Sequence, residues 1–169
     1  KVAFGHKIDF GHDYDLIHML SNRNDKSIAP RHRTDMAHLS FEYSANLETA
    51  LDLQTFSGHL RDAMSDTGVF PLGGIRVRGT RVDVAAIASG EDEIGFIDMT
   101  LRMGMGRDEA VRVSVTEAIY AAAEAWLKPQ LGDRPFALSL EVMEIESRFS
   151  ERRFNTIHGF LKAGETQGG

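Results

Sequence analysis

The residues Leu39-Ser40-Phe41-Glu42-Tyr43-Ser44 alternate apolar with polar side chains, and this stretch decides how the fold begins. Alternation with a period of two predicts a β-strand with one buried face, because successive side chains of a strand point to opposite faces of a sheet. A helix is predicted next, with Asp52 able to cap its N-terminus and Gly68 marking its end. Its apolar residues keep helical spacing: Leu53, Phe56, Leu60 and Met64.

A second strand is predicted after the turn Phe70-Pro71-Leu72-Gly73-Gly74. Residues 75–78 alternate again, with Arg76 and Arg78 at the polar positions. Residues 82–87 either extend this strand or form a separate short strand. The first half of the domain is therefore predicted as strand, helix, strand.

The second half repeats this order of elements. Its long helix ends or kinks near Pro129 and Gly132. The predicted elements are a strand over residues 94–103, the turn Gly104-Met105-Gly106-Arg107, a helix capped by Asp108, and a strand over residues 136–145.

The repeated order of elements predicts the fold class. A strand, a crossover helix and a second strand make a parallel βαβ unit with a right-handed crossover. Two such units predict an α/β (α+β) fold, a four-stranded sheet with two helices on one face. The other face is left bare. We expect its apolar residues to need a partner, most simply a second copy of the chain.

The composition excludes several classes of function. The 169 residues contain no cysteine, which rules out disulfides and thiolate nucleophiles and fits a cytoplasmic protein. The formal net charge of −6 is unfavourable for contact with a nucleic-acid backbone. No apolar run reaches the roughly 18 residues of a membrane span, and the first residues lack the apolar segment of a signal peptide. We expect no binding to nucleic acid or membrane.

The chain divides into three parts by composition. Residues 1–36 hold four of the seven histidines and no sustained apolar period, which indicates an N-terminal extension whose status is left open. Residues 37–163 form the predicted domain, and residues 164–169 form a polar tail. The histidine spacings match no metal site, and the chain carries no P-loop, zinc motif or serine nucleophile elbow. We therefore expect no metal ion.

The turn Gly104-Met105-Gly106-Arg107 is the most informative stretch for chemistry. Backbone N–H groups at a helix N-terminus favour anions, and glycines let a ligand come close. Arg107 opposes the helix dipole and so needs a partner. That partner is either an anionic ligand or a neighbouring carboxylate, Asp108 or Glu109.

Three further arginines, Arg76, Arg78 and Arg81, lie on or beside one short predicted strand. Such a group is typical of a solvent-facing stripe. Two arginines brought together from the two halves would instead suit a dicarboxylate, because each guanidinium can bind one carboxylate through two hydrogen bonds.

Four stretches together carry a resemblance to a known family. They resemble 5-carboxymethyl-2-hydroxymuconate isomerase of the tautomerase superfamily, in order, over about three quarters of the chain. The stretches are Met36-Ala37-His38-Leu39-Ser40-Phe41-Glu42-Tyr43-Ser44-Ala45-Asn46, Thr67-Gly68-Val69-Phe70-Pro71-Leu72-Gly73-Gly74-Ile75-Arg76, Asp98-Met99-Thr100-Leu101-Arg102-Met103-Gly104-Met105-Gly106-Arg107 and Ala137-Leu138-Ser139-Leu140-Glu141.

The resemblance implies a homotrimer of βαβ-repeat subunits that acts without metal or cofactor. The family reaction moves a proton along a conjugated 2-hydroxydienoate, turning a dienol into an enone during bacterial breakdown of aromatic acids. An N-terminal proline carries the proton as a secondary amine. Two family arginines match Arg76 and Arg107. The resemblance assigns them to binding the substrate carboxylates and stabilising the dienolate oxygen.

The chain departs from the family at the catalytic position. Where the family has Met-Pro-His, this sequence has Met36-Ala37-His38. With residues 1–36 attached, the nitrogen of Ala37 is an amide and cannot act as a base. Ala37 could act only as a free N-terminal amine, whose ordinary pKa is about 7.7–8.0. The other candidate bases are the side chains of His38 and Glu42.

Three functions remain open from the sequence. The leading interpretation is an isomerase of the 5-carboxymethyl-2-hydroxymuconate type, with Arg76, Arg107 and a free Ala37 amine as its catalytic residues. The second is a catalytically silent trimer that binds small carboxylic acids, because the base is lost while both arginines are kept. The third is a tautomerase that acts on another enol.

Overall fold

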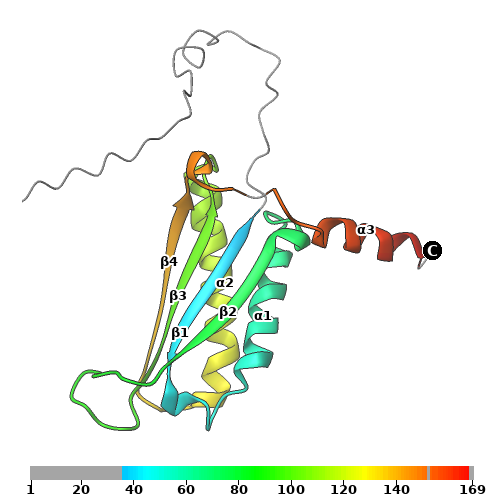
Figure 1. The fold of residues 1–169 in the computed structure, drawn as a ribbon. Helices are drawn as coiled ribbons and strands as arrows, with labels where there is room; N and C mark the ends of the chain where they lie inside the picture. Colours follow the sequence, from blue (N-terminus) through cyan, green and yellow to red (C-terminus); the bar gives the residue numbers. More distant parts are fainter. Residues whose placement is uncertain (1–35, 152, 168–169) are drawn as a thin grey trace, which may run out of the picture. The chain divides into compact units, whose positions relative to one another are not determined.

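A computed structural model describes residues 36–151 and 153–167 (Figure 1). These residues form four strands, three α-helices and three short 3₁₀ helices. The strands are β1 (Ala37–Ser44), β2 (Ile75–Val82), β3 (Gly95–Gly104) and β4 (Phe136–Ile145). The α-helices are α1 (Leu53–Asp66), α2 (Glu109–Leu131) and α3 (Ile157–Gln167). The 3₁₀ helices are η1 (Ala45–Leu47), η2 (Leu72–Gly74) and η3 (Ser147–Phe149).

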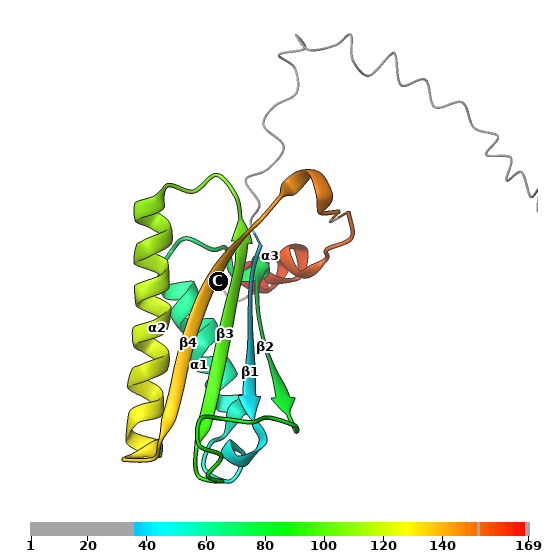
Figure 2. The same cartoon turned by 90° about the vertical axis from the view of Figure 1, so that its left-hand side faces the viewer.

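The four strands form one sheet in the order β2-β1-β3-β4. β1 is parallel to β2, β3 is parallel to β4, and the two central strands β1 and β3 are antiparallel. α1 and α2 lie side by side over one face of the sheet, as Figures 1 and 2 both show. The predicted fold of two βαβ units with both helices on one face is confirmed.

The core lies between the sheet and these two helices. The apolar positions of the central strands are fully or almost fully buried, Leu39 and Phe41 of β1 and Ile97, Met99, Leu101 and Met103 of β3 among them, whereas most of those of β2 and β4 are half-buried. Gly79 of β2 lies so close to Phe41 that an added Cβ would be 2.5 Å from the ring. Both helices bury their residues at helical spacing: Phe56, Leu60 and Met64 of α1, and Val115, Ile119, Ala123 and Leu127 of α2.

The predicted helix ends are found with one difference. The carboxylate of Asp52 accepts hydrogen bonds of 3.0 Å from the backbone N–H groups of Gln54 and Thr55, so it caps α1. Asp108 occupies the same position before α2 but caps it without a side-chain hydrogen bond. α2 continues through Pro129 and ends at Gly132, whose φ of 57° favours glycine.

Two details of the predicted fold are wrong. β2 ends at Val82, and residues 83–87 form no strand. The physical reason is that Val82 pairs with Ser44, the last residue of β1, beyond which the neighbouring chain turns into η1. The face of the sheet away from the helices is also mostly polar rather than apolar. We call this the open face, and its side chains on β1 are His38, Ser40 and Glu42.

The segment after β4 contains a helix that the sequence did not indicate. α3 packs against η2 at one end of the sheet. It crosses the expected boundary between residues 163 and 164, and the division into domains stays a prediction. No helix within the described ranges is long and apolar enough to cross a membrane.

Candidate functional site

Several of the candidate residues identified from the sequence lie at one end of the sheet. Ala37 opens β1 and pairs with Ile75 at the start of β2 and with Met103 near the end of β3. The turn before β2 and the turn after β3 therefore meet at the first residue of a central strand. The side chain of Ala37 is fully buried, and its nitrogen is joined to Met36 as an amide.

Arg76 lies one residue further along β2, on the open face. It pairs in register with His38, and its Nη1 atom is 3.3 Å from Nε2 of that histidine. The same Nη1 atom donates a longer hydrogen bond, of 3.4 Å, to the carbonyl oxygen of Gly74. Both side chains are half-buried, so Arg76 is held by β1 and by η2 while part of it stays accessible.

Arg107 lies in the turn between β3 and α2. Its Nη1 atom donates a 2.6 Å hydrogen bond to the carbonyl oxygen of Gly104. Its guanidinium carbon lies 5.3 Å from the ring centroid of Phe70, a buried residue of the turn before β2. A guanidinium over an aromatic face is attracted by the ring quadrupole, so this contact fastens the turn of one half to the turn of the other.

The fold thus brings Ala37, Arg76 and Arg107 to the same end of the sheet. Arg76 is on the open face, whereas Arg107 comes from the loop that packs on Phe70. Gly106 in that loop has a φ of 89°, which a residue with a side chain rarely adopts. The register of the strands and the contact of Arg107 with Phe70 together determine where the backbone and the two arginines lie at this end of the sheet.

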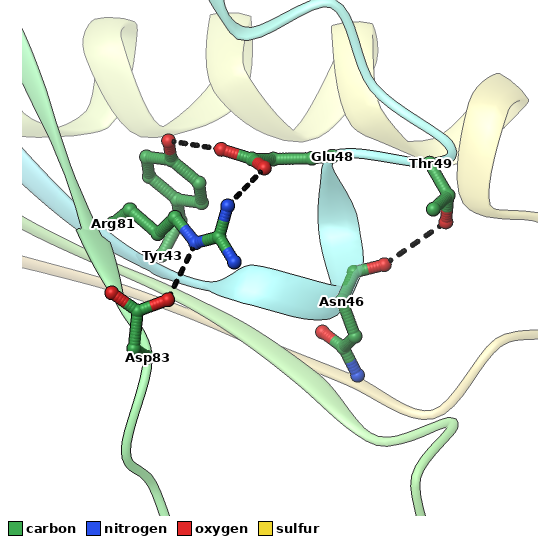
Figure 3. Close-up of polar contacts among 6 residues, drawn as sticks. All are labelled: Tyr43, Asn46, Glu48, Thr49, Arg81 and Asp83. Atoms are coloured by element: carbon green, nitrogen blue, oxygen red, sulfur yellow. Dashed lines mark hydrogen bonds and ion pairs between the residues drawn. The ribbon is translucent and has the colours of Figure 1, made fainter.

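Arg81 does not belong to this site. It lies near the end of β2 and forms ion pairs of 2.8 Å with Glu48 and with Asp83 (Figure 3). Tyr43 donates a 2.9 Å hydrogen bond to Glu48 in the same cluster. Burial and the neighbouring Glu48 carboxylate raise the pKa of the Tyr43 hydroxyl. The three arginines are therefore not one stripe, because alternation separates Arg81 from Arg76.

A cavity of about 340 Å³ lies beside this cluster, at the sheet end away from Ala37. Its polar lining includes Asp83, Glu91 and Asp92. Carboxylates repel an anionic ligand, so this cavity does not suit a dicarboxylate. The Ala37 end of the sheet, where Arg76 and Arg107 lie, suits an anionic ligand better.

Sequence reasoning missed three contacts at this end. The pairing of His38 with Arg76 follows from the register of two parallel strands and could have been found from the alternation. The contacts of Phe70 with Arg107 and of His158 with Gly73 have no sequence signal, because they join separate loops and helices.

The other described histidines and acidic residues do not build a metal site. His59 packs between the helices, with Nε2 3.1 Å from the carbonyl oxygen of Ala122 and the ring stacked on Trp126. Within residues 36–151 and 153–167 no three His, Asp or Glu side chains are grouped to hold a metal ion.

Comparison with solved structures first identifies the class of protein to which this fold belongs. Solved structures that superpose on most of the chain have the tautomerase fold. A crystal structure of a 5-carboxymethyl-2-hydroxymuconate delta-isomerase is 33% identical, with a TM-score of 0.70, and the match covers 76% of this chain and 95% of that one. The corresponding isomerase from Deinococcus radiodurans R1 is 27% identical, with a TM-score of 0.68 and coverage of 76% and 96%.

The family then follows from the sequence. The model of the 5-carboxymethyl-2-hydroxymuconate isomerase family matches residues 37–161. The 5-carboxymethyl-2-hydroxymuconate Delta-isomerase of Escherichia coli is 29% identical over 127 residues, which are 75% of this chain and 100% of that protein. The chain belongs to the 5-carboxymethyl-2-hydroxymuconate isomerase family, and the predicted resemblance is confirmed.

Proposed function

We propose that this protein is an isomerase of 5-carboxymethyl-2-hydroxymuconate that uses no cofactor. The observation that carries the proposal is the family match, which spans the whole length of the Escherichia coli isomerase. The location of Arg76 and Arg107 at the same sheet end supports it, because the substrate class is a small molecule with several carboxylates. Work in the cytoplasm is part of the proposal, and the lack of cysteine in the sequence fits it.

The reaction is a proton shift without net oxidation. A base removes the proton of the enol hydroxyl, and the oxygen forms a C=O bond with the electrons of the broken O–H bond. The double bonds of the substrate shift along its conjugated system, and the carbon at the far end of that system takes up a proton. The charge that develops on the oxygen is the part of the transition state that a cation stabilises best.

We assign the two arginines to this charge and to the substrate carboxylates. Arg76 faces the open side of the sheet, where a ligand can approach. Arg107 is fixed by Gly104 and Phe70, so little freedom is lost when it binds an anion. Ala37 enters the reaction only where its nitrogen is a free N-terminal amine.

The silent binding protein is the weaker alternative. It rests on Ala37 in place of the family proline, whereas the named relatives are isomerases. Assembly as a homotrimer is part of the proposal. Phe149, Phe154 and Phe160 support it, because these residues are 81%, 93% and 79% exposed and no element within residues 36–151 and 153–167 covers them.

The direct test follows the ultraviolet absorbance of a 2-hydroxymuconate-type dienol. Two proteins are compared, the full chain and a chain that begins at Ala37. The shorter chain keeps the core, since the buried side chains lie between Ala37 and Ile145. Turnover that is lost in Arg107→Ala supports the isomerase. Binding of a dicarboxylate by both proteins without turnover would establish the silent binder.

A further inference from the structure

Three basic side chains form a row across the open face of the sheet. His38 lies on the central strand β1, with Arg76 beside it on β2 and Arg102 beside it on β3. Side chains at paired positions of adjacent strands are about 5 Å apart at Cβ and point to the same face. We call Arg76, His38 and Arg102 the basic row. It lies at the sheet end where Ala37 and Arg107 are also found.

The contact between His38 and Arg76 favours one placement of the imidazole lone pair. A guanidinium has only donors, so Nη1 of Arg76 can contact Nε2 of His38 favourably only if Nε2 accepts. An imidazole that accepts at Nε2 carries its proton on Nδ1. His38 in this arrangement is a candidate base, and Arg76 beside it is a group that can bind an anion.

The structure also separates His38 from Glu42, the other side chain that could replace the family proline. Glu42 lies four residues further along β1, about 13 Å away at the rise of a strand. It faces Thr80 on β2 and the carboxylate of Asp98 on β3. A second carboxylate beside Glu42 repels an anionic substrate. His38 is therefore the candidate base that lies beside the arginines.

The charges of the open face change along the strands. The first row is basic, as described. The next row is mixed, with Arg78, Ser40, Thr100 and Glu141 in register, and the third row is acidic, with Thr80, Glu42, Asp98 and Ser139. An anion is attracted most strongly to the first row, where His38 stands between two arginines.

We propose that His38 is the proton carrier of the isomerisation in the intact chain, where the nitrogen of Ala37 is an amide. When a substrate carboxylate binds Arg76, the guanidinium releases Nε2 of His38. Nε2 then takes the proton from the enol hydroxyl, and the imidazolium gives a proton to the carbon at the other end of the conjugated system. No electron acceptor is needed, because the step only moves a proton and the double bonds. Arg76 and Arg102 hold a substrate carboxylate beside the ring. The inference rests on the proposed function.

The test uses the full chain, with its mass confirmed as intact before and after each assay. His38→Gln keeps a hydrogen-bond acceptor but cannot carry a proton. We expect kcat to fall by about 100-fold or more, as removal of a general base does. Binding of an unreactive dicarboxylate should change less than about threefold. The matched control is His59→Gln, a half-buried histidine between α1 and α2, which should keep kcat.

Two readouts separate a catalytic role from a structural one. In the wild type kcat/KM should rise with pH as the imidazole loses its proton, and this rise should be absent in His38→Gln. Arg102→Ala changes an exposed residue of the basic row, so it should fold and raise KM about tenfold with a smaller effect on kcat. This second variant keeps the test valid if His38→Gln is unstable.

Each failure points to a different conclusion. If intact His38→Gln turns over like the wild type, His38 is not the proton carrier. If the intact chain is inactive while the chain beginning at Ala37 is active, the terminal amine does the chemistry and the inference fails, although the protein is an isomerase. If neither protein turns over, the proposed function fails with it.

Discussion

The imidazole of His158 lies directly on the backbone of Gly73. A Cβ added at Gly73 would be 2.5 Å from Nδ1 of His158, closer than real Cβ atoms approach any neighbour. This contact seats α3 against η2, the short turn that leads into Arg76. The C-terminal helix is therefore coupled to the candidate site through one glycine.

We expect Gly73→Ala to loosen α3 without unfolding the domain. The added methyl group displaces only a side-chain ring, so the free energy of unfolding should fall by less than about 1 kcal/mol. Amide hydrogen exchange within residues 157–167 should become faster. The control is Gly159→Ala, where nothing lies within 4 Å of the added Cβ and helix propensity favours alanine. Equal protection of α3 in both variants would contradict the coupling.

Arg107→Ala should abolish turnover while the fold remains. Its guanidinium stacks on Phe70 at the surface of the core, so its loss leaves a small gap but no buried charge. We expect kcat/KM to fall by about 100-fold or more if the arginine stabilises the dienolate. Steady-state kinetics and a circular dichroism spectrum decide this. Arg61→Ala, on the exposed side of α1, is the matched control.

Deletion of the residues after Arg148 should weaken self-association. The deletion removes three exposed phenylalanines, Phe149, Phe154 and Phe160, together with α3. Large apolar side chains at this exposure are stabilised when a second molecule covers them. Light scattering at low micromolar concentration should show a smaller species than the full chain. A truncated protein with unchanged mass would refute the role of this segment.

The Asp52 cap of α1 should make the free energy of unfolding depend on pH in the acidic range. Hydrogen bonds from the Thr55 side chain and backbone, and from the Gln54 backbone, lower the pKa of Asp52 below its ordinary value of 3.8. Because the pKa is lower in the folded state, the contribution is present above pH 3.8 and is lost as pH falls through the folded value. Wild type should be more stable than Asp52→Asn to urea at pH 7, and this difference should shrink below pH 3.8.

The elements that were predicted correctly are those with a strong local signal. β1 and β3 alternate cleanly, and the Asp52 cap precedes a regular apolar spacing, so their structure follows from neighbouring residues. Residues 83–87 could not be judged in this way, because β2 ends where its partner strand ends. α3 was missed because Gly159 and Gly164 weaken its helical signal and its one phenylalanine, Phe160, is exposed.

The candidate site was predicted only in part. Arg76 and Arg107 were chosen from the turn chemistry and the family resemblance, and strand register explains why they share one sheet end with Ala37. The expected apolar open face was wrong, although the polar residues Ser40 and Arg78 already stood at the alternate positions. The Arg107–Phe70 contact depends on how two separate turns pack, which no local pattern encodes.

The ordering of charge along the open face has a kinetic consequence. With arginines in the first row and carboxylates in the third, this face has a dipole directed along the strands. An approaching polyanion is turned toward the Ala37 end before it touches the protein, even though the whole chain carries a charge of −6. The range of this guidance is about 8 Å at physiological salt, so the rate of capture should fall as ionic strength rises while the bound geometry stays the same.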